Sequence, residues 1–244
     1  TVGIAALAAD GKVVVVMADK LFTDDAGLQH EEDEPKAMWL PNDWLAVYAG
    51  GATLAHMVVA RAGGVISDAM KGEGRPPHPV ELLVDMEAAY AEIWNWNIKA
   101  SVLDPFGITH EQYVKGPLDS GLRREIDQGI ADQEANYSPD LLLCGFDTAP
   151  DGVMHGNILS IGLRTHEVEG SFGVVGSGGD IAKARLTWQK TKAGTPTVRV
   201  LYEVYEAKTH AEMEAHVGKG QADAWLMVGN GGEGLRRVPA ETLG

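Results

Sequence analysis

Strand-like and helix-like segments occur in blocks along this chain and do not alternate strictly. The first block contains two pairs of apolar segments, and a short turn separates the members of each pair. These segments are residues 1–9 and 12–18, and then residues 36–40 and 44–48. Asp10-Gly11 between the first two is a strong signal for a β-hairpin. Because paired strands follow each other directly, this block indicates an antiparallel sheet.

Helical periodicity replaces this pattern from Ala52 onwards. Apolar residues recur on one face of two consecutive segments, which predicts amphipathic helices at residues 52–71 and 80–98. The sequence GEGRPPHP at residues 72–79 separates them, because glycine and proline break helices. Strands, helices and again strands are predicted further on, at residues 140–146, 153–161 and 166–175, then near Asp180 and from Thr195-Pro196, and finally at residues 223–228 and 235–238.

This block order predicts an α+β fold in which two antiparallel sheets lie between layers of helices, a four-layer αββα sandwich. One such sandwich accounts for the whole length, so we expect a single domain over residues 1–244. Residues 99–118 lack a sustained period, and residues 119–136 have the pattern of a polar helix. We therefore interpret residues 99–137 as an insertion on the surface, and residues 24–34 as an acidic loop.

Charge and cysteine content exclude several classes of function. The 20 basic and 35 acidic residues give a net charge of -15 without a segregated basic patch, and such a surface repels nucleic acid. The single cysteine, Cys144, excludes an intrachain disulfide and a multi-cysteine metal site, and its apolar neighbours indicate a buried strand. No apolar run approaches the roughly 18 residues of a membrane span. We expect a soluble, cytoplasmic protein without a metal or an organic cofactor.

The first residue, Thr1, carries a hydroxyl group and an α-amine together. An α-amine has an ordinary pKa of about 7.7–8.0, so near neutral pH it can take the hydroxyl proton while the oxygen attacks an amide carbonyl. Lys36 is the candidate cation that disfavours protonation of this amine, and Asp19 is the candidate carboxylate that pairs with Lys36. On its own, a first-position threonine is more often an accident of processing or trimming than a catalytic residue. Removal of methionine and self-cleavage of a longer propeptide are the two routes that would expose it.

Five short motifs occur in the same order as in one known family. They are Thr1 in a small apolar strand, Met17-Ala18-Asp19-Lys20 closing a valine-rich strand, Lys36 opening the next strand, Ala49-Gly50-Gly51 before a helix, and VVGSGG at residues 174–179 before another helix. In order and spacing the chain resembles the proteasome β subunit and the bacterial HslV peptidase, which are N-terminal-nucleophile hydrolases. The likeness covers most of the chain apart from residues 99–137.

The resemblance implies a threonine peptidase or amidase in which Thr1 is both nucleophile and base. Lys36 would tune Thr1, Asp19 would pair with Lys36, and the N–H group of Gly50 would face the developing oxyanion. Ser177 would form a hydrogen bond near the Thr1 amine. The pocket for the substrate side chain would be lined by Phe22, Met38, Tyr48 and Ala52, and the bulk of Tyr48 would restrict it to small side chains.

One departure from the family concerns residues 218–221. The family has an additional Asp there and a Ser three residues later, whereas this chain has Gly218-Lys219-Gly220-Gln221. The departure supports a second hypothesis, a non-catalytic ring or scaffold subunit with the same fold. A third hypothesis is an amidase for a small amide or an acyl-homoserine-type ligand.

The resemblance also implies partners. A peptide or amide substrate is expected, together with a homo-oligomeric ring or a related assembly. An ATP-dependent unfoldase partner cannot be inferred from the sequence. Nucleic acid and membrane are not expected as partners, because of the charge and the hydropathy described above.

Overall fold

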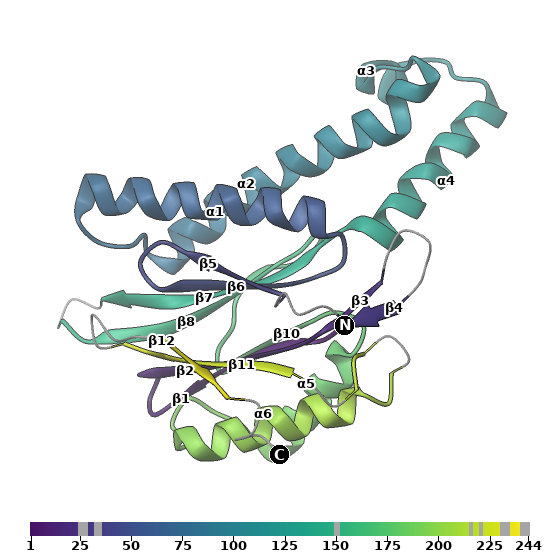
Figure 1. Cartoon of the computed structure of the whole chain (residues 1–244). Coiled ribbons are helices and arrows are strands. Elements are labelled where there is room, and N and C mark those ends of the chain that lie inside the picture. The colour runs from purple at the N-terminus through teal and green to yellow at the C-terminus, as the bar shows by residue number, and fades with distance from the viewer. Residues whose placement is uncertain are drawn as a thin grey trace.

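Two antiparallel sheets lie face to face between two layers of helices (Figure 1). The computed structural model describes residues 1–23, 29–31, 36–148, 152–214, 217–219, 222–229 and 235–239, with the backbone alone at residues 21–23, 29–31 and 235. Within this part of the chain each of the two sheets has five strands. The predicted α+β class is therefore confirmed, and the layers are those of an αββα sandwich.

The first sheet joins strands from the beginning and the end of the sequence. In spatial order its strands are β10 (Phe172–Val175), β1 (Gly3–Ala8), β2 (Val13–Asp19), β11 (Ala222–Val228) and β12 (Leu235–Val238). The predicted hairpin joins β1 to β2, with Ala8 paired to Val13. Asp10 and Gly11 in its turn have φ values of 60° and 79°, which Asp and Gly tolerate better than most residues.

The second sheet also contains only antiparallel neighbours in the described residues. In spatial order its strands are β5 (Ala37–Leu40), β6 (Trp44–Ala49), β7 (Asp140–Thr148), β8 (Met154–Ile161) and β9 (His166–Val168). The predicted turn between the first two is present, with positive φ values at Asn42 and Asp43. Cys144 lies on β7 and is fully buried, as its neighbours predict.

Side chains on β2 alternate between two apolar clusters, because successive residues of a strand point to opposite faces. Val14 and Val16 join the cluster between the two sheets, whereas Val15 and Met17 join the cluster beneath the helices. Every residue of β2 is buried. The unbroken apolar run at residues 13–18 is thus explained by a strand that is covered on both faces.

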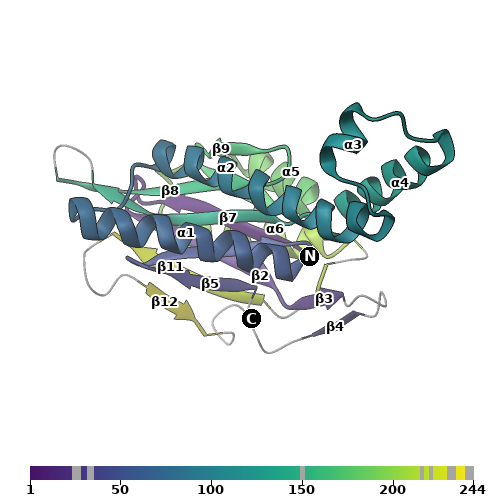
Figure 2. The same cartoon turned by 90° about the horizontal axis from the view of Figure 1, so that it is seen from above.

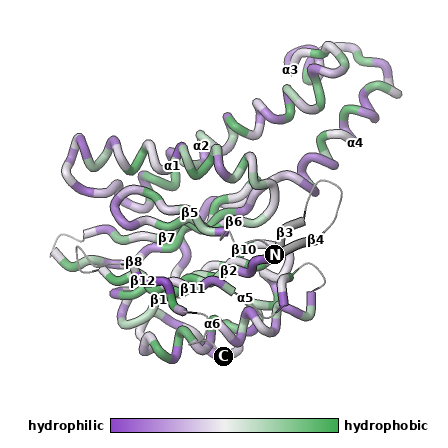
Figure 3. The backbone as a smooth tube through the Cα atoms, in the orientation of Figure 1, coloured by the Kyte–Doolittle hydropathy of each residue, from purple (hydrophilic) through white to green (hydrophobic). Residues whose placement is uncertain are grey.

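Two pairs of helices form the outer layers (Figures 1 and 2). α1 (Ala52–Glu73) and α2 (Pro79–Ile98) cover the second sheet, and α5 (Gly179–Gln189) and α6 (Thr197–Ala211) cover the first. The predicted breaker between α1 and α2 acts through Gly74, which ends α1 in the left-handed region, and through a capping box of His78 and Glu81 that starts α2. Along α1, α2 and α4, Figure 3 shows both hydrophilic and hydrophobic residues, as expected of helices with one exposed face.

Residues 99–137, called the arm below, project away from the sandwich (Figures 1 and 2). The arm continues α2 and contains η1 (Lys99–Leu103), η2 (Asp104–Phe106), α3 (His110–Lys115) and α4 (Ser120–Tyr137). The predicted polar helix at residues 119–136 is confirmed as α4. A small apolar cluster of its own holds the arm together, with Val102, Leu103 and Ile126 among its buried members.

Two predictions about connecting segments are wrong. Residues 24–34 are not a loop throughout, because residues 29–31 form β4 (Gln29–Glu31), which pairs with β3 (Leu21–Thr23); residues 24–28 and 32–35 lie outside the described residues. Residues 166–175 are not one strand. Two strands occur there, β9 in the second sheet and β10 in the first.

The short segment between β9 and β10 carries the chain from one sheet to the other. The N–H group of Glu169 donates to the carbonyl of Ile158 on β8, and the carbonyl of Ser171 accepts from Leu7 on β1, both at 2.8 Å. An alternating apolar pattern records which residues are buried but not which sheet a strand joins, and so it does not reveal the crossover.

No helix in the described residues is both long enough and apolar enough to cross a membrane.

Candidate active site

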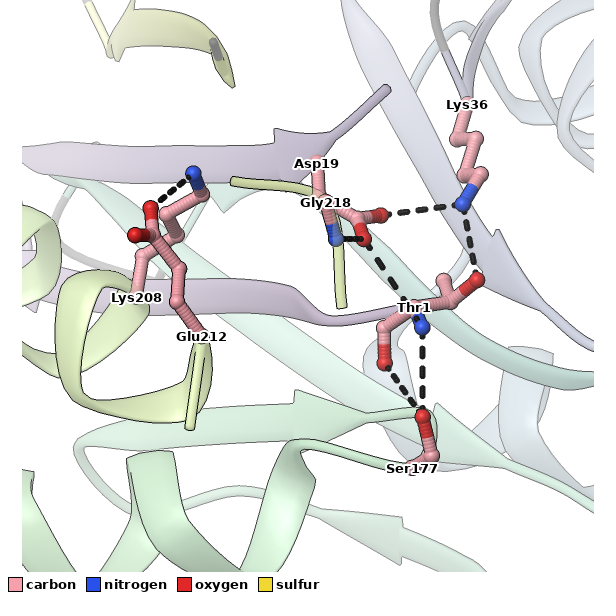
Figure 4. A network of polar contacts seen from close by, with 7 residues as sticks. All are labelled: Thr1, Asp19, Lys36, Ser177, Lys208, Glu212 and Gly218. Carbon is pink, nitrogen blue, oxygen red and sulfur yellow. Dashed lines mark hydrogen bonds and ion pairs between the residues drawn. The ribbon is translucent and has the colours of Figure 1, made fainter. Parts of the chain in front are cut away.

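Four separate parts of the chain meet around Thr1 (Figure 4). β1 and β2 are antiparallel, so the residues before β1 lie beside the end of β2. Asp19 ends β2, and its N–H group donates to the carbonyl of Val2 at 3.1 Å. Lys36 directly precedes β5 in the other sheet, and Ser177 lies between β10 and α5. All three residues have contacts to Thr1 or to its partners.

Lys36 connects the Thr1 hydroxyl group to Asp19. Its Nζ atom donates to Oγ1 of Thr1 at 2.7 Å and to Oδ1 of Asp19 at 2.9 Å. Both charged side chains are removed from water, with 3% of Lys36 and 1% of Asp19 exposed. A buried cation without a counter-ion is strongly unfavourable, so Asp19 is what allows Lys36 to be placed against the hydroxyl oxygen. The predicted pairing of Lys36 with Asp19 agrees with this geometry.

The second carboxylate oxygen of Asp19 has different neighbours. Oδ2 accepts from the N–H group of Gly218 at 2.8 Å and lies 3.7 Å from the α-amine nitrogen of Thr1. Gly218 belongs to residues 218–221, where the resemblance calls for an Asp and a Ser. A backbone N–H group at this place holds Asp19, while residues 220 and 221 lie outside the described residues.

The Thr1 amine and carbonyl are bound by the segment that leads into α5. The amine donates to Oγ of Ser177 at 3.1 Å, as predicted for Ser177, and the carbonyl accepts from the N–H group of Gly178 at 3.2 Å. Gly176 has φ of 91°, and a Cβ atom there would lie 2.4 Å from the Thr1 carbonyl oxygen. Only glycine fits at this position, because both the backbone conformation and the space exclude a side chain.

The surroundings of Thr1 favour the neutral amine. Burial lowers the pKa of the Thr1 α-amine from its ordinary value of 8.0. The Asp19 carboxylate opposes this change and the Lys36 ammonium adds to it, while Glu214 opposes it more weakly. Since the net shift is downward, a larger fraction of this amine is in the free-base form near pH 7 than for an ordinary α-amine.

This arrangement can perform nucleophilic chemistry. The hydroxyl oxygen of Thr1 accepts a hydrogen bond from Lys36, which would stabilise the oxygen as it loses its proton. The α-amine on the same residue has a lowered pKa and can serve as the base that receives this proton. Thr1 therefore provides a nucleophile and a base, and Lys36 provides the nearby positive charge.

Gly50 lies in the turn between β6 and α1, close to this group. A Cβ atom on Gly176 would lie 3.0 Å from Cβ of Ala49, so the turn is adjacent to the segment that binds the Thr1 carbonyl. Gly50 itself has φ of 87°, a value that favours glycine. Its role as an oxyanion donor stays a prediction.

The four residues predicted to line the substrate pocket have different environments. Met38 and Tyr48 lie on the face of the second sheet that packs on α1 and α2, and Tyr48 contacts His56 edge to face with ring centroids 5.6 Å apart. Ala52 is the exposed first residue of α1. The side chain of Phe22 lies outside the described part. The pocket therefore stays a prediction.

Several groups in this region were not identified from the sequence. The N–H groups of Gly178 and Gly218 are backbone donors, which leave no side-chain signal. Glu214 influences the amine through its charge. Lys208 on α6 is fully buried and pairs with Glu212 at 2.6 Å beside this group of residues (Figure 4). The spacing of Lys208 and Glu212 by four residues is the one available signal for that pair.

No metal-binding site is identified in the part of the chain that the structure describes. No group of three or more His, Cys, Asp or Glu residues there is arranged to hold a metal ion.

Comparison with models of protein families and with curated proteins finds no match to this chain. The case for a function therefore depends on the residues around Thr1.

Proposed function

We propose that this chain is an N-terminal threonine hydrolase that cleaves a peptide or amide bond through an acyl ester on Thr1. The observation that carries the proposal is the position of Lys36, which is buried and contacts both Oγ1 of Thr1 at 2.7 Å and Oδ1 of Asp19 at 2.9 Å. A lysine in that place is suited to stabilise the alkoxide of Thr1. The lowered pKa of the Thr1 amine supports the same proposal, because it favours the form that accepts a proton.

The proposed reaction has two stages. The α-amine of Thr1 takes the hydroxyl proton, directly or through a water molecule, while Oγ1 bonds to the substrate carbonyl carbon. The oxyanion that forms faces the N–H group of Gly50, and its collapse breaks the C–N bond as the ammonium returns the proton to the leaving amine. In the second stage the amine takes a proton from water, which attacks the ester. The carboxylic acid product leaves and Thr1 regains its hydroxyl proton.

The proposal requires a free α-amine on Thr1 in the mature protein. N-terminal sequencing and intact mass of the purified protein measure this directly. Incubation with a β-lactone should then add the mass of one ring-opened lactone, and peptide mapping should place it on Thr1. Thr1→Ala should prevent the adduct, whereas Thr1→Ser, which keeps the hydroxyl and the amine, should retain it. No adduct on the wild-type protein, together with no hydrolysis across a diverse peptide library, would contradict the proposal.

A non-catalytic scaffold subunit is the second candidate. It is favoured by the sequence at residues 218–221, which carries neither the Asp nor the Ser found in the family. Thr1→Ala distinguishes the two candidates, because a scaffold would keep its cellular role and its assembly without the hydroxyl. Hydrolysis of small amides but not of peptides by the wild-type protein would instead indicate the amidase hypothesis.

We further propose that the chain acts in the cytoplasm as a homo-oligomer. Three large apolar side chains on α5 and α6 are strongly exposed, namely Trp188, Val198 and Tyr202. Exposed apolar groups of this size suit contact with another copy of the chain. Light scattering of the purified protein measures the assembly, and a mass of about one chain at micromolar concentration would contradict it.

A further inference from the structure

The arm rejoins the sandwich at the turn that contains Gly50. At the end of α4, residues 137–139 pass directly against this turn and lead into β7. A Cβ atom on Gly50 would lie 2.4 Å from the carbonyl oxygen of Ser138, and one on Gly51 would lie 2.3 Å from that of Tyr137. The two backbone segments are therefore in direct contact, and glycine is required at both positions of the turn. Figures 1 and 2 show the arm leaving the sandwich at the end where the N-terminus lies.

Tyr90 on α2 binds this segment from the helix layer. Its hydroxyl group donates to the carbonyl of Pro139 at 2.7 Å, and only 2% of Tyr90 is exposed. Burial raises the pKa of Tyr90 well above its ordinary value, so this hydroxyl keeps its proton and remains a donor at all ordinary assay pH values. Pro139 is buried as well, so water does not compete for its carbonyl.

The next residue after Pro139 connects this hydrogen bond to the turn. Asp140 begins β7 and is paired with Ala49, the last residue of β6 and the neighbour of Gly50. A shift of Pro139 is thus transmitted to Gly50 by two routes, through the strand pairing and through the contact with Ser138. Neither route involves Thr1, Asp19 or Lys36.

We propose that Tyr90 is a positioning residue, which fixes the base of the arm and thereby aims the Gly50 N–H group at the oxyanion. The inference depends on the proposed function, since an oxyanion forms only if Thr1 attacks a carbonyl. Tyr90 lies outside the reacting group and acts through Pro139. Loss of its hydroxyl should leave the Thr1 nucleophile intact and should weaken only the stabilisation of the oxyanion.

Two electrophiles separate these effects. A β-lactone is opened by attack on its carbonyl carbon, so negative charge develops on a carbonyl oxygen. A peptide vinyl sulfone is attacked at the alkene carbon farther from the sulfone, which is bonded to the peptide: Oγ1 forms a C–O bond there, the electron pair moves to the carbon beside the sulfone, and that carbon takes the proton from the Thr1 ammonium. The second reaction needs the nucleophile and the base but creates no carbonyl oxyanion.

The experiment compares the rates of Thr1 modification in the wild type and in Tyr90→Phe, which keeps the buried ring and removes the hydroxyl. We expect the β-lactone rate to fall at least fivefold. The fall should not exceed the roughly 10²- to 10³-fold that loss of a complete oxyanion donor costs. The vinyl sulfone rate should change less than twofold. Tyr113→Phe is the matched control, because it removes a hydroxyl that donates to Asp127 at 2.7 Å within the arm and away from Gly50. Both of its rates should equal those of the wild type.

The other outcomes overturn the inference in distinguishable ways. Equal loss of both rates in Tyr90→Phe would mean that Tyr90 maintains the site as a whole and does not aim Gly50. No loss of either rate would mean that Tyr90 is not needed for the position of Gly50. If neither probe modifies wild-type Thr1, the proposed function fails, and the inference fails with it.

Discussion

Replacement of Asp19 by asparagine tests the buried group around Thr1 most directly. Asp19→Asn keeps the shape of the side chain but removes its charge and one of its two acceptor oxygens. In the wild-type protein Oδ1 accepts from Lys36 and Oδ2 accepts from Gly218, at 2.9 and 2.8 Å. Whichever way the new amide is turned, its NH₂ group must face one of these two donors.

The expected loss of stability follows from burial. Lys36 is 3% exposed, so removal of the carboxylate breaks an ion pair that is buried in the interior. Breaking a buried ion pair by removal of one partner costs about 3–5 kcal/mol. The unsatisfied donor is part of this figure, since it alone would cost about 1–3 kcal/mol. We therefore expect the free energy of unfolding to fall by about 3–5 kcal/mol, a large share of the roughly 5–15 kcal/mol typical of folded proteins.

The double variant Asp19→Asn/Lys36→Met identifies the cause. Methionine removes the buried charge and fills a similar volume, so the double variant should be more stable than Asp19→Asn alone by at least about 1 kcal/mol. Urea unfolding followed by circular dichroism at fixed pH and protein concentration measures both values. Agreement between circular dichroism and tryptophan fluorescence checks that the transition has two states.

Two results would refute this reasoning. One is an Asp19→Asn variant within about 1 kcal/mol of the wild type, a loss well below that expected for a broken buried pair. The other is a double variant that is destabilised by the sum of the two single changes, which would mean that Lys36 and Asp19 act independently. Glu111→Gln is the control, because its pair with Lys115 is at 3.6 Å and mostly exposed, so little change in stability is expected.

Two further predictions concern Thr1 and its support. The rate of Thr1 acylation by a β-lactone should rise with pH and level off with a midpoint below 8.0, because the amine must lose its proton to act as base and burial lowers its pKa; a midpoint at or above 8.0 would contradict this. Gly176→Ala should lower the melting temperature and abolish acylation, since its φ of 91° and the 2.4 Å approach to the Thr1 carbonyl exclude a Cβ atom. Gly170→Ala, with open space around it, is the control, and equal melting temperatures for the two variants would be evidence against the argument.

Periodicity was sufficient for most elements of the fold. The valine run of β2 and the helical stripe of α1 depend on which faces are buried, and this information is local to each segment. The crossover after β9 and the pairing of β3 with β4 depend on contacts with distant strands. Such contacts have no local pattern, so the sequence predicts the layers better than the connections between them.

The sequence likewise predicted some groups of the candidate site and missed others. Asp19, Lys36 and Ser177 have charged or hydroxyl side chains, so their chemistry can be read from the sequence. Their positions at the ends of predicted strands indicate that they lie close together in the fold. The N–H groups of Gly178 and Gly218 have no such mark, since every residue except proline carries one. Backbone donors were therefore found only once the folded chain placed them beside Thr1 and Asp19.

A backbone donor also explains how the site is supported without the Asp and Ser that residues 218–221 lack. The resemblance implies that a side-chain pair at that place acts on the Thr1 amine, whereas the Gly218 N–H group of this chain donates to the carboxylate of Asp19. The amine still has Ser177 at 3.1 Å and Asp19 at 3.7 Å as neighbours. An uncharged backbone donor supports Asp19 without adding a negative charge that would raise the pKa of the amine. The glycine-containing segment is thus compatible with a base on Thr1, because it preserves the carboxylate that Lys36 needs.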